Sequence, residues 1–333
     1  MKHLCLLLLV ALFISCQPKT KEYVKIEGMI FGTFYHIVYQ PVGDERDLSE
    51  GISQSLNNVD WSLSTYKDTS TISRFSQSTE GIEIDSLMKT VYLAGKEVYE
   101  NTYGAFDMTV GALVNAWGFG FKKQDMVTTA LVDSLLMNVG MDMLSLKDGF
   151  LHKSKPNIVL DASAIAKGFG VDVVADYLVA QGIKNYMVEI GGEIRVKGKN
   201  SAGTHWRVGI DKPIDDMAAK SRELQGVISL TNVGLATSGN YRNFYIRDGK
   251  KYAHTIDPKT GYPVQHSLLS ASIVAPLCMN ADAYATACMV MGLEKSMELI
   301  ESLPNTEGYF IYVDENGNNQ VSYTSGFGDL IVE

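Results

Sequence analysis

The stretch NIVLDASAIAKGFGVDVVADY, residues 157–177, joins a short apolar run to a long helical pattern. Ile158–Leu160 predicts a buried strand, and Asp161 and Ser163 are candidate N-caps for the helix that follows. That helix has an apolar stripe through Ile165 and Phe169, and the pattern places Asp172 and Asp176 away from the stripe. The segment therefore predicts a strand and a helix that meet at a polar corner.

Strand patterns joined by tight turns follow this segment, and helical patterns surround it. Tyr186–Ile190 and Glu193–Lys197 flank Gly191-Gly192, and further turns are expected at Asp248-Gly249 and Asn316-Gly317. Val24–Tyr39 predicts an opening strand or a bulged hairpin. Helices are expected near residues 48–58, 85–103, 108–117, 129–137 and 280–291. This order predicts an α+β fold with antiparallel sheets and flanking helices, in one continuous body.

The composition excludes several classes of protein. The chain has 333 residues, of which 46% are hydrophobic and 20% charged, so a globular fold is expected. The formal net charge is −9 and no basic run is present, which argues against a nucleic-acid partner. Walker, Rossmann, zinc-protease and nucleophile-elbow motifs are absent from the sequence.

The N-terminus has the pattern of an export signal. Lys2 precedes an apolar run from Leu4 to Ile14, which is too short to span a bilayer as a helix. The run ends at Ser15-Cys16, which resembles a bacterial lipoprotein processing site. The resemblance implies a signal peptide over residues 1–15, lipidation of Cys16 and a lipidated tether over 16–23, which leaves residues 24–333 as the folded domain. The alternative is an ordinary secretory signal. The expected location is a bacterial membrane, with the protein anchored by lipid and facing the periplasm.

Three groups of polar residues could carry chemistry. Asp282 and Thr286 are four residues apart on the predicted Ala-rich helix, so a carboxylate and a hydroxyl could share one hard cation. Lys167 lies in the first turn of a helix, where an anion would offset the unfavourable dipole. His254 precedes an Asp-Pro-Lys-Thr-Gly loop and could transfer a proton. For each group, a purely structural role is the competing interpretation.

Together these segments resemble the ApbE family of FAD:protein FMN transferases from about residue 28 to 327. Eight matching segments occur in the family's order: Phe31-Gly-Thr33, Ser64-Thr-Tyr66, Ala105-Phe-Asp107, Asp161 to Gly168, Gly191-Gly-Glu193, Ala236 to Tyr241, His254 to Gly261 and Asn280 to Thr286. Phe31 stands where the family usually has Met, and Glu193 stands where Asp is frequent. The family fold that the resemblance implies is α+β with antiparallel sheets in T-fold-like modules.

The resemblance also implies residue roles. Asp282 and Thr286 match side-chain ligands of Mg²⁺, and Ser163 matches a residue that gives its backbone carbonyl to the same ion. His254 matches a histidine close to the chemistry. On chemical grounds His254 is the first candidate to assist proton removal from the acceptor hydroxyl, and Asp257 is the second. The positions that match flavin or FAD contacts, or lie in matching segments beside them, are Phe31, Tyr66, Ala105, Phe106, Asp107, Lys167, Thr237 and Ser238.

The implied reaction is a Mg²⁺-dependent transfer of FMN from FAD to a Thr or Ser hydroxyl of an acceptor protein, with release of AMP. The implied acceptors are membrane redox proteins, such as subunits of NADH:quinone oxidoreductases or Rnf complexes. Two alternatives stay open on the sequence: an FAD pyrophosphatase that gives FMN and AMP, and a flavin-binding lipoprotein without enzymatic activity.

Overall fold

The computed structural model describes residues 22–43, 47–120, 127–213, 223–240, 244–247 and 250–332. The predicted signal peptide, Cys16, most of the tether and the Asp248-Gly249 turn lie outside these residues. No helix in the described ranges is long and apolar enough to cross a membrane.

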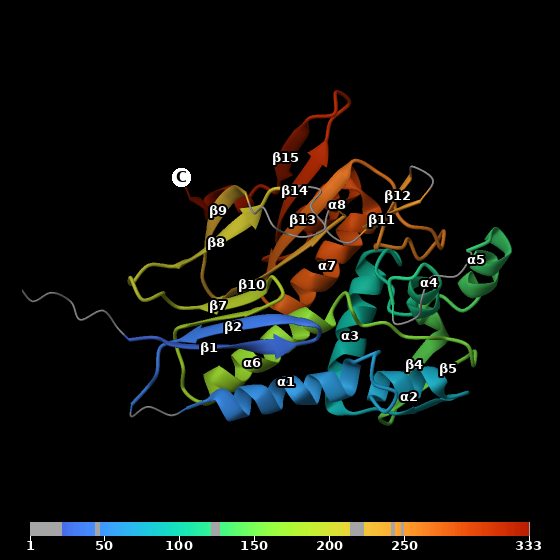
Figure 1. The fold of residues 1–333 in the computed structure, drawn as a ribbon, viewed down its shortest axis with the longest axis horizontal. Helices are drawn as coiled ribbons and strands as arrows, with labels where there is room; N and C mark the ends of the chain where they lie inside the picture. Colours follow the sequence, from blue (N-terminus) through green and yellow to red (C-terminus); the bar gives the residue numbers. More distant parts are fainter. Residues whose placement is uncertain are drawn as a thin grey trace, which may run out of the picture.

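An eight-stranded, fully antiparallel sheet forms the centre of the molecule (Figure 1). Its strand order is β1-β2-β6-β7-β10-β13-β14-β15, so β1 and β15 are its edges. The predicted α+β fold with antiparallel sheets is confirmed. The strands are β1 (Val24–Ile30), β2 (Thr33–Tyr39), β6 (Tyr186–Ile190), β7 (Glu193–Lys197), β10 (Val233–Gly239), β13 (Leu268–Ala275), β14 (Glu307–Val313) and β15 (Asn319–Tyr323).

Helices cover one face of this sheet. Helix α6 (Ala166–Ala180) packs on β6 and β7, α7 (Cys278–Met291) packs on β10 and β13, and the two helices pack on each other. Figure 1 shows α1 (Ser49–Leu63) beside α6, and α8 (Leu293–Ser302) follows α7 and packs on β14. The other helices are α2 (Thr71–Gln77), α3 (Ser86–Asn101), α4 (Gly111–Ala116), α5 (Thr129–Leu136) and the 3₁₀ turns η1 (Met141–Met143) and η2 (Phe327–Leu330).

Three small sheets complete the fold. Strands β16 (Ile331–Val332), β9 (Leu224–Leu230) and β8 (Trp206–Asp211) form one sheet, whose apolar side chains share a core with β7, β10, β13 and β14. The second sheet contains β3 (Gly81–Glu83), β5 (Phe150–Lys153) and β4 (Leu144–Lys147), and the third contains β11 (Phe244–Arg247) and β12 (Lys250–Ala253).

The polar corner at residues 157–168 differs from the expectation in two respects. The predicted strand Ile158–Leu160 forms only an isolated parallel bridge between Val159 and Val110. Neither Asp161 nor Ser163 caps α6, because Ile165 is the N-cap residue and gives no side-chain hydrogen bond. Asp161 instead accepts a hydrogen bond from the Ser163 N–H, at 2.7 Å, and so shapes the loop before the helix.

The opening hairpin is regular and has no bulge, because the register between β1 and β2 is continuous from Val24↔Tyr39 to Ile30↔Thr33. Phe31 and Gly32 form its two-residue turn, and both have positive φ values, 52° and 73°. This geometry matches the right-handed twist of paired strands, and glycine adopts it without a steric penalty.

Helices α6 and α7 supply the missing caps for each other through buried carboxylates. Asp172 on α6 accepts hydrogen bonds from the Cys278 and Met279 N–H groups at the start of α7, at 3.1 and 2.9 Å. Asp282 on α7 accepts one from the Gly168 N–H in the first turn of α6, at 3.0 Å. The expectation that Asp172 lies away from the buried side of α6 is therefore wrong.

The two helix backbones lie close enough together for a carboxylate on each helix to reach the N–H groups at the start of the other. A Cβ atom on Gly168 would lie 2.4 Å from the Cys278 carbonyl oxygen, which is too close for any side chain. Asp172 also binds Arg195 of β7, at 3.1 Å, so the cap of α7 is tied to the sheet. Burial raises the pKa of Asp172 to about 6, although Arg195 and the two N–H groups favour the charged form.

Replacement of Asp172 by Ala should lower the free energy of unfolding by about 3 kcal/mol, because it leaves two helix N–H groups without their acceptor and removes the buried one of the two carboxylates that bind Arg195. Asp176 provides a matched control, since it binds the same Arg195 at 2.9 Å but its side chain is 70% exposed. Asp176→Ala should cost less than about 1 kcal/mol. Urea unfolding of the two variants checks this difference, and equal losses would contradict the capping role of Asp172.

Candidate active site

A cavity of about 840 Å³ lies beside the contact of α6 with α7. Its walls come from the β2 strand, the β6–β7 turn, the end of β10, the inner face of α7 and the loops before α4 and after β12. The structure brings most of the predicted site residues to this one cavity: Tyr66, Ala105, Phe106, Asp107, Ser163, Lys167, Thr237, Ser238, His254, Asp282 and Thr286 all line it.

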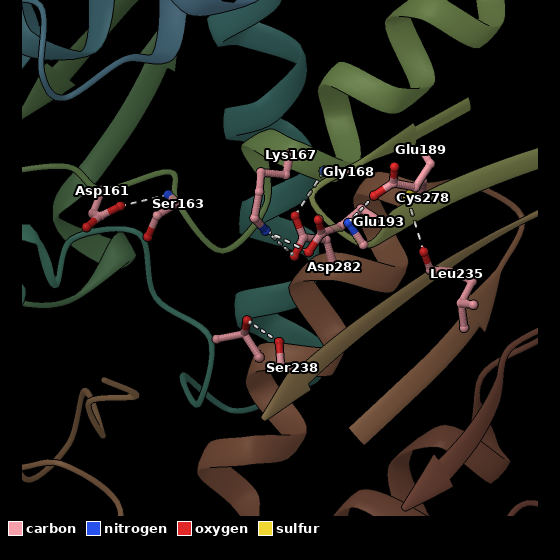
Figure 2. A network of polar contacts seen from close by, with 12 residues as sticks. Asp161, Ser163, Lys167, Gly168, Glu189, Glu193, Leu235, Ser238, Cys278 and Asp282 are labelled. Carbon is pink, nitrogen blue, oxygen red and sulfur yellow. Dashed lines mark hydrogen bonds and ion pairs between the residues drawn. The ribbon is translucent and has the colours of Figure 1, made fainter. Parts of the chain in front are cut away.

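Lys167 is held between two carboxylates in the cavity wall. Figure 2 shows its Nζ directed toward Glu193 and Asp282. The distances are 2.7 Å to Glu193 Oε1 and 3.7 Å to Asp282 Oδ1. Because Asp282 also accepts the Gly168 N–H, the helix cap and the lysine contact fix its carboxylate plane.

Burial and charge shift the pKa values in this group in a consistent way. Burial raises the pKa of Glu193 to about 7, and the positive charge of Lys167 opposes that shift. Burial lowers the pKa of Lys167, but the negative charges of Asp282 and Glu193 raise it more, so the net shift is upward. Lys167 therefore stays charged at neutral pH.

The hydroxyl groups of β10 and α7 lie next to these carboxylates. Ser238 and Thr286 share a hydrogen bond of 3.1 Å between Oγ and Oγ1, and Thr237 shares one of 2.7 Å with Ser272 on β13. Thr286 is one helical turn after Asp282, as the i, i+4 spacing predicts. Ser163 lines the cavity on the loop that leads into α6.

Aromatic and apolar groups line another part of the cavity. Tyr66 is 74% exposed at this edge, whereas Ala105, Phe106 and Asp107 are buried in the loop that precedes α4. Asp107 accepts hydrogen bonds from the N–H and the hydroxyl of Thr109, at 2.7 and 2.5 Å. Burial nevertheless raises the pKa of Asp107 to about 6. An exposed ring beside a buried apolar wall suits a planar heterocycle.

His254 and the loop after it border the same cavity. The imidazole of His254 lies edge-on to the Phe119 ring, with 6.4 Å between centroids. Asp257, by contrast, does not line the cavity, because its carboxylate is used to build the loop. Its two oxygens accept hydrogen bonds from the Lys259 N–H at 2.8 Å and the Thr260 hydroxyl at 3.1 Å.

Phe31 is likewise absent from the cavity lining. Its ring packs from the β1–β2 turn onto α6, where Gly170 leaves room for it: a Cβ atom on Gly170 would lie 2.6 Å from the ring. Phe31, the departure from the family pattern expected from the sequence, therefore packs against a helix and not into the cavity.

A histidine–carboxylate pair in the cavity lining was not anticipated from the sequence. His36 Nδ1 lies 2.5 Å from Glu189 Oε2, and Glu189 Oε1 accepts the Gly192 N–H at 2.6 Å. The two residues are register partners on β2 and β6, although 153 positions separate them in the chain. Only the strand pairing reveals this contact.

The chemistry of the lining suits a hard divalent cation. Among the residues that the structure describes, six carboxylates and one lysine line the cavity, so these groups favour an anionic ligand that a cation accompanies. Asp282, Thr286 and the Ser163 carbonyl offer oxygen atoms, the donors that Mg²⁺ prefers. Within the described ranges, no three His, Cys, Asp or Glu side chains are grouped as metal ligands. The predicted donor set differs from such a group, since it combines a carboxylate, a hydroxyl and a carbonyl.

Comparison with known proteins identifies the family. The sequence model of the ApbE family matches residues 31–310. The FAD:protein FMN transferase of Haemophilus influenzae is 40% identical over 316 residues, covering 91% of this chain and 90% of that protein. The corresponding protein of Vibrio cholerae is 42% identical over 298 residues, covering 87% of this chain and 88% of that protein.

A solved structure agrees with the sequence matches. The flavin transferase ApbE from Vibrio cholerae superposes with a TM-score of 0.84 at 38% identity, and the match covers 93% of this chain and 99% of that one. The sequence matches and the fold match both extend over most of the chain, and the protein belongs to the ApbE family.

Proposed function

We propose that this protein transfers FMN from FAD to a Thr or Ser hydroxyl of an acceptor protein and releases AMP. The proposal rests on the observation that candidate metal, flavin and proton-transfer groups line one cavity. These groups are Asp282, Thr286, Ser163, Lys167, Tyr66, the Ala105–Asp107 wall and His254. The family relatives named FAD:protein FMN transferase support the same reaction.

Asp282, Thr286 and the Ser163 carbonyl would hold Mg²⁺, and the ion would neutralise charge on the pyrophosphate. The protein's own groups then bind and orient the substrate. Lys167 holds a fixed positive charge beside the Asp282 carboxylate, where the phosphates would lie. Tyr66 and the buried Ala105–Asp107 wall hold the flavin ring, which aims the FMN phosphorus at the acceptor.

In the proposed step, the acceptor hydroxyl oxygen attacks the FMN phosphorus. A new P–O bond to the acceptor forms, the bond from that phosphorus to the bridging oxygen breaks, and AMP leaves with the bridging oxygen. His254 takes the hydroxyl proton. The chain contributes mainly by positioning and by charge, as is typical of phosphoryl transfer.

The decisive experiment incubates the purified protein with FAD, Mg²⁺ and an acceptor domain that carries a Thr target. We expect flavin fluorescence and mass to remain on the denatured acceptor in equal amount to the AMP released. AMP with free FMN only would indicate hydrolysis by water instead of transfer. Bound FAD without AMP would indicate a flavin carrier.

Replacement of Asp282 by Asn should reduce transfer at least about a hundredfold and raise the Mg²⁺ concentration needed for half-maximal rate, because a charged oxygen ligand is lost. The amide oxygen can still accept the Gly168 N–H, which limits the effect on folding. Asp172→Asn is the matched control: it alters the equivalent cap on α7 outside the cavity and should keep the wild-type Mg²⁺ requirement. An unchanged Mg²⁺ requirement in Asp282→Asn would refute the proposed metal site.

We further propose export and lipid anchoring at Cys16, which would place the cavity on the same membrane surface as flavin-acceptor redox proteins. The support is the sequence from Lys2 to Cys16.

Expression in a bacterium with labelled palmitate tests the anchor. We expect label and membrane fractionation for the natural chain and for Cys5→Ser, and loss of both in Cys16→Ser. Label that persists in Cys16→Ser would contradict lipidation at this position.

A further inference from the structure

Glu193 lines the cavity and has one carboxylate oxygen without a hydrogen-bond partner among the described residues. The residue is 4% exposed and lines the cavity at the start of β7. Its Oε1 binds Lys167 at 2.7 Å, whereas its Oε2 is buried and has no hydrogen-bond partner in the described part of the chain. A buried carboxylate oxygen without a donor is costly, so this oxygen points to a group that the substrate supplies.

The backbone around Glu193 and the contact with Lys167 restrict how far this side chain can move. Gly191 and Gly192 form the β6–β7 turn with φ values of 63° and 107°, and the Gly191 N–H donates to the Phe34 carbonyl at 3.0 Å. Glu193 then pairs in register with Ile190. With its backbone in the sheet and its Oε1 on Lys167, the side chain cannot turn toward solvent without losing the ion pair.

The position of Glu193 restricts the identity of the donor. Lys167 contacts both Glu193 and Asp282. The Glu193 carboxylate is therefore next to the lysine that we expect to bind the phosphates. A phosphate oxygen would be repelled by the carboxylate, whereas a sugar hydroxyl can donate to it. In FAD, the ribityl and the ribose hydroxyls are the donors attached within a few bonds of the pyrophosphate.

We propose that Glu193 Oε2 accepts a hydrogen bond from a sugar hydroxyl of FAD next to the pyrophosphate, and thereby positions the dinucleotide on Lys167. This inference rests on the proposed function, because it takes FAD as the ligand. It assigns Glu193 a role in substrate selection. We assign no such role to the neighbouring Glu189, because both of its oxygens already have partners, in His36 and the Gly192 N–H.

The test measures equilibrium binding of FAD and of four analogues that each lack one hydroxyl, at the ribose 2′ or 3′ or the ribityl 3′ or 4′ position, in Mg²⁺. One analogue should bind the natural protein about 10- to 100-fold more weakly than FAD, as expected for a hydrogen bond to a charged acceptor. In Glu193→Gln, FAD itself should bind more weakly, and the same analogue should bind nearly as well as FAD. The analogue that responds distinguishes the ribose from the ribityl chain.

Glu189→Gln should keep the discrimination of the natural protein, and Glu193→Ala repeats the test without an amide at this position. Thermal unfolding of each variant checks that it is folded. The proposal would be overturned if the analogue lost the same factor of affinity, relative to FAD, in the natural protein and in Glu193→Gln. So would a Glu193→Gln variant whose only change is a higher Mg²⁺ requirement, since Oε2 would then serve the metal. FAD that binds without being transferred would refute the proposed function and leave this inference intact.

Discussion

The exchange of carboxylate caps between α6 and α7 holds the cavity together. Each helix begins without a side-chain cap of its own, and each takes an acceptor from the other: Asp172 for α7 and Asp282 for α6. The two helix starts can approach because Gly168 leaves no side chain between them. Since Asp282 and Thr286 lie on α7 and Lys167 lies on α6, the same contact that closes the core also sets the spacing of the polar site.

This arrangement explains how a lysine and several carboxylates can coexist in a half-closed cavity. Asp282 is stabilised by the Gly168 N–H and by Lys167. Lys167 stays charged because the carboxylates of Asp282 and Glu193 raise its pKa. Glu193 is different, because burial raises its pKa to about 7 and one of its oxygens lacks a partner within the described residues. A buried carboxylate oxygen without a donor is costly, and for this reason we assign its partner to the ligand in the proposed contact.

The sheet contributes the other half of the site. The two-residue turns at Phe31-Gly32 and Gly191-Gly192 place the ends of β2, β6 and β7 at the cavity. His36 and Glu189 face each other only because β2 and β6 are neighbours in the sheet. The loop after His254 is closed by Asp257 and is held by the Trp117 indole, which donates to the Gly261 carbonyl at 2.8 Å. Asp257 thus acts in the fold of the loop, outside the cavity lining.

Local patterns in the sequence were sufficient for the fold class, for most helices and hairpins, and for the placement of Asp282 and Thr286 one turn apart on the same helix, because these depend on periodicity, turn residues and spacing within one element. Local patterns failed for the caps of α6 and for the burial of Asp172. In each case the partner lies on another element: Asp282 is 114 positions from Gly168, and Met279 is 107 from Asp172. Hydrogen bonds and burial between distant segments are decided by sheet order and helix packing, and only the tertiary structure contains that information.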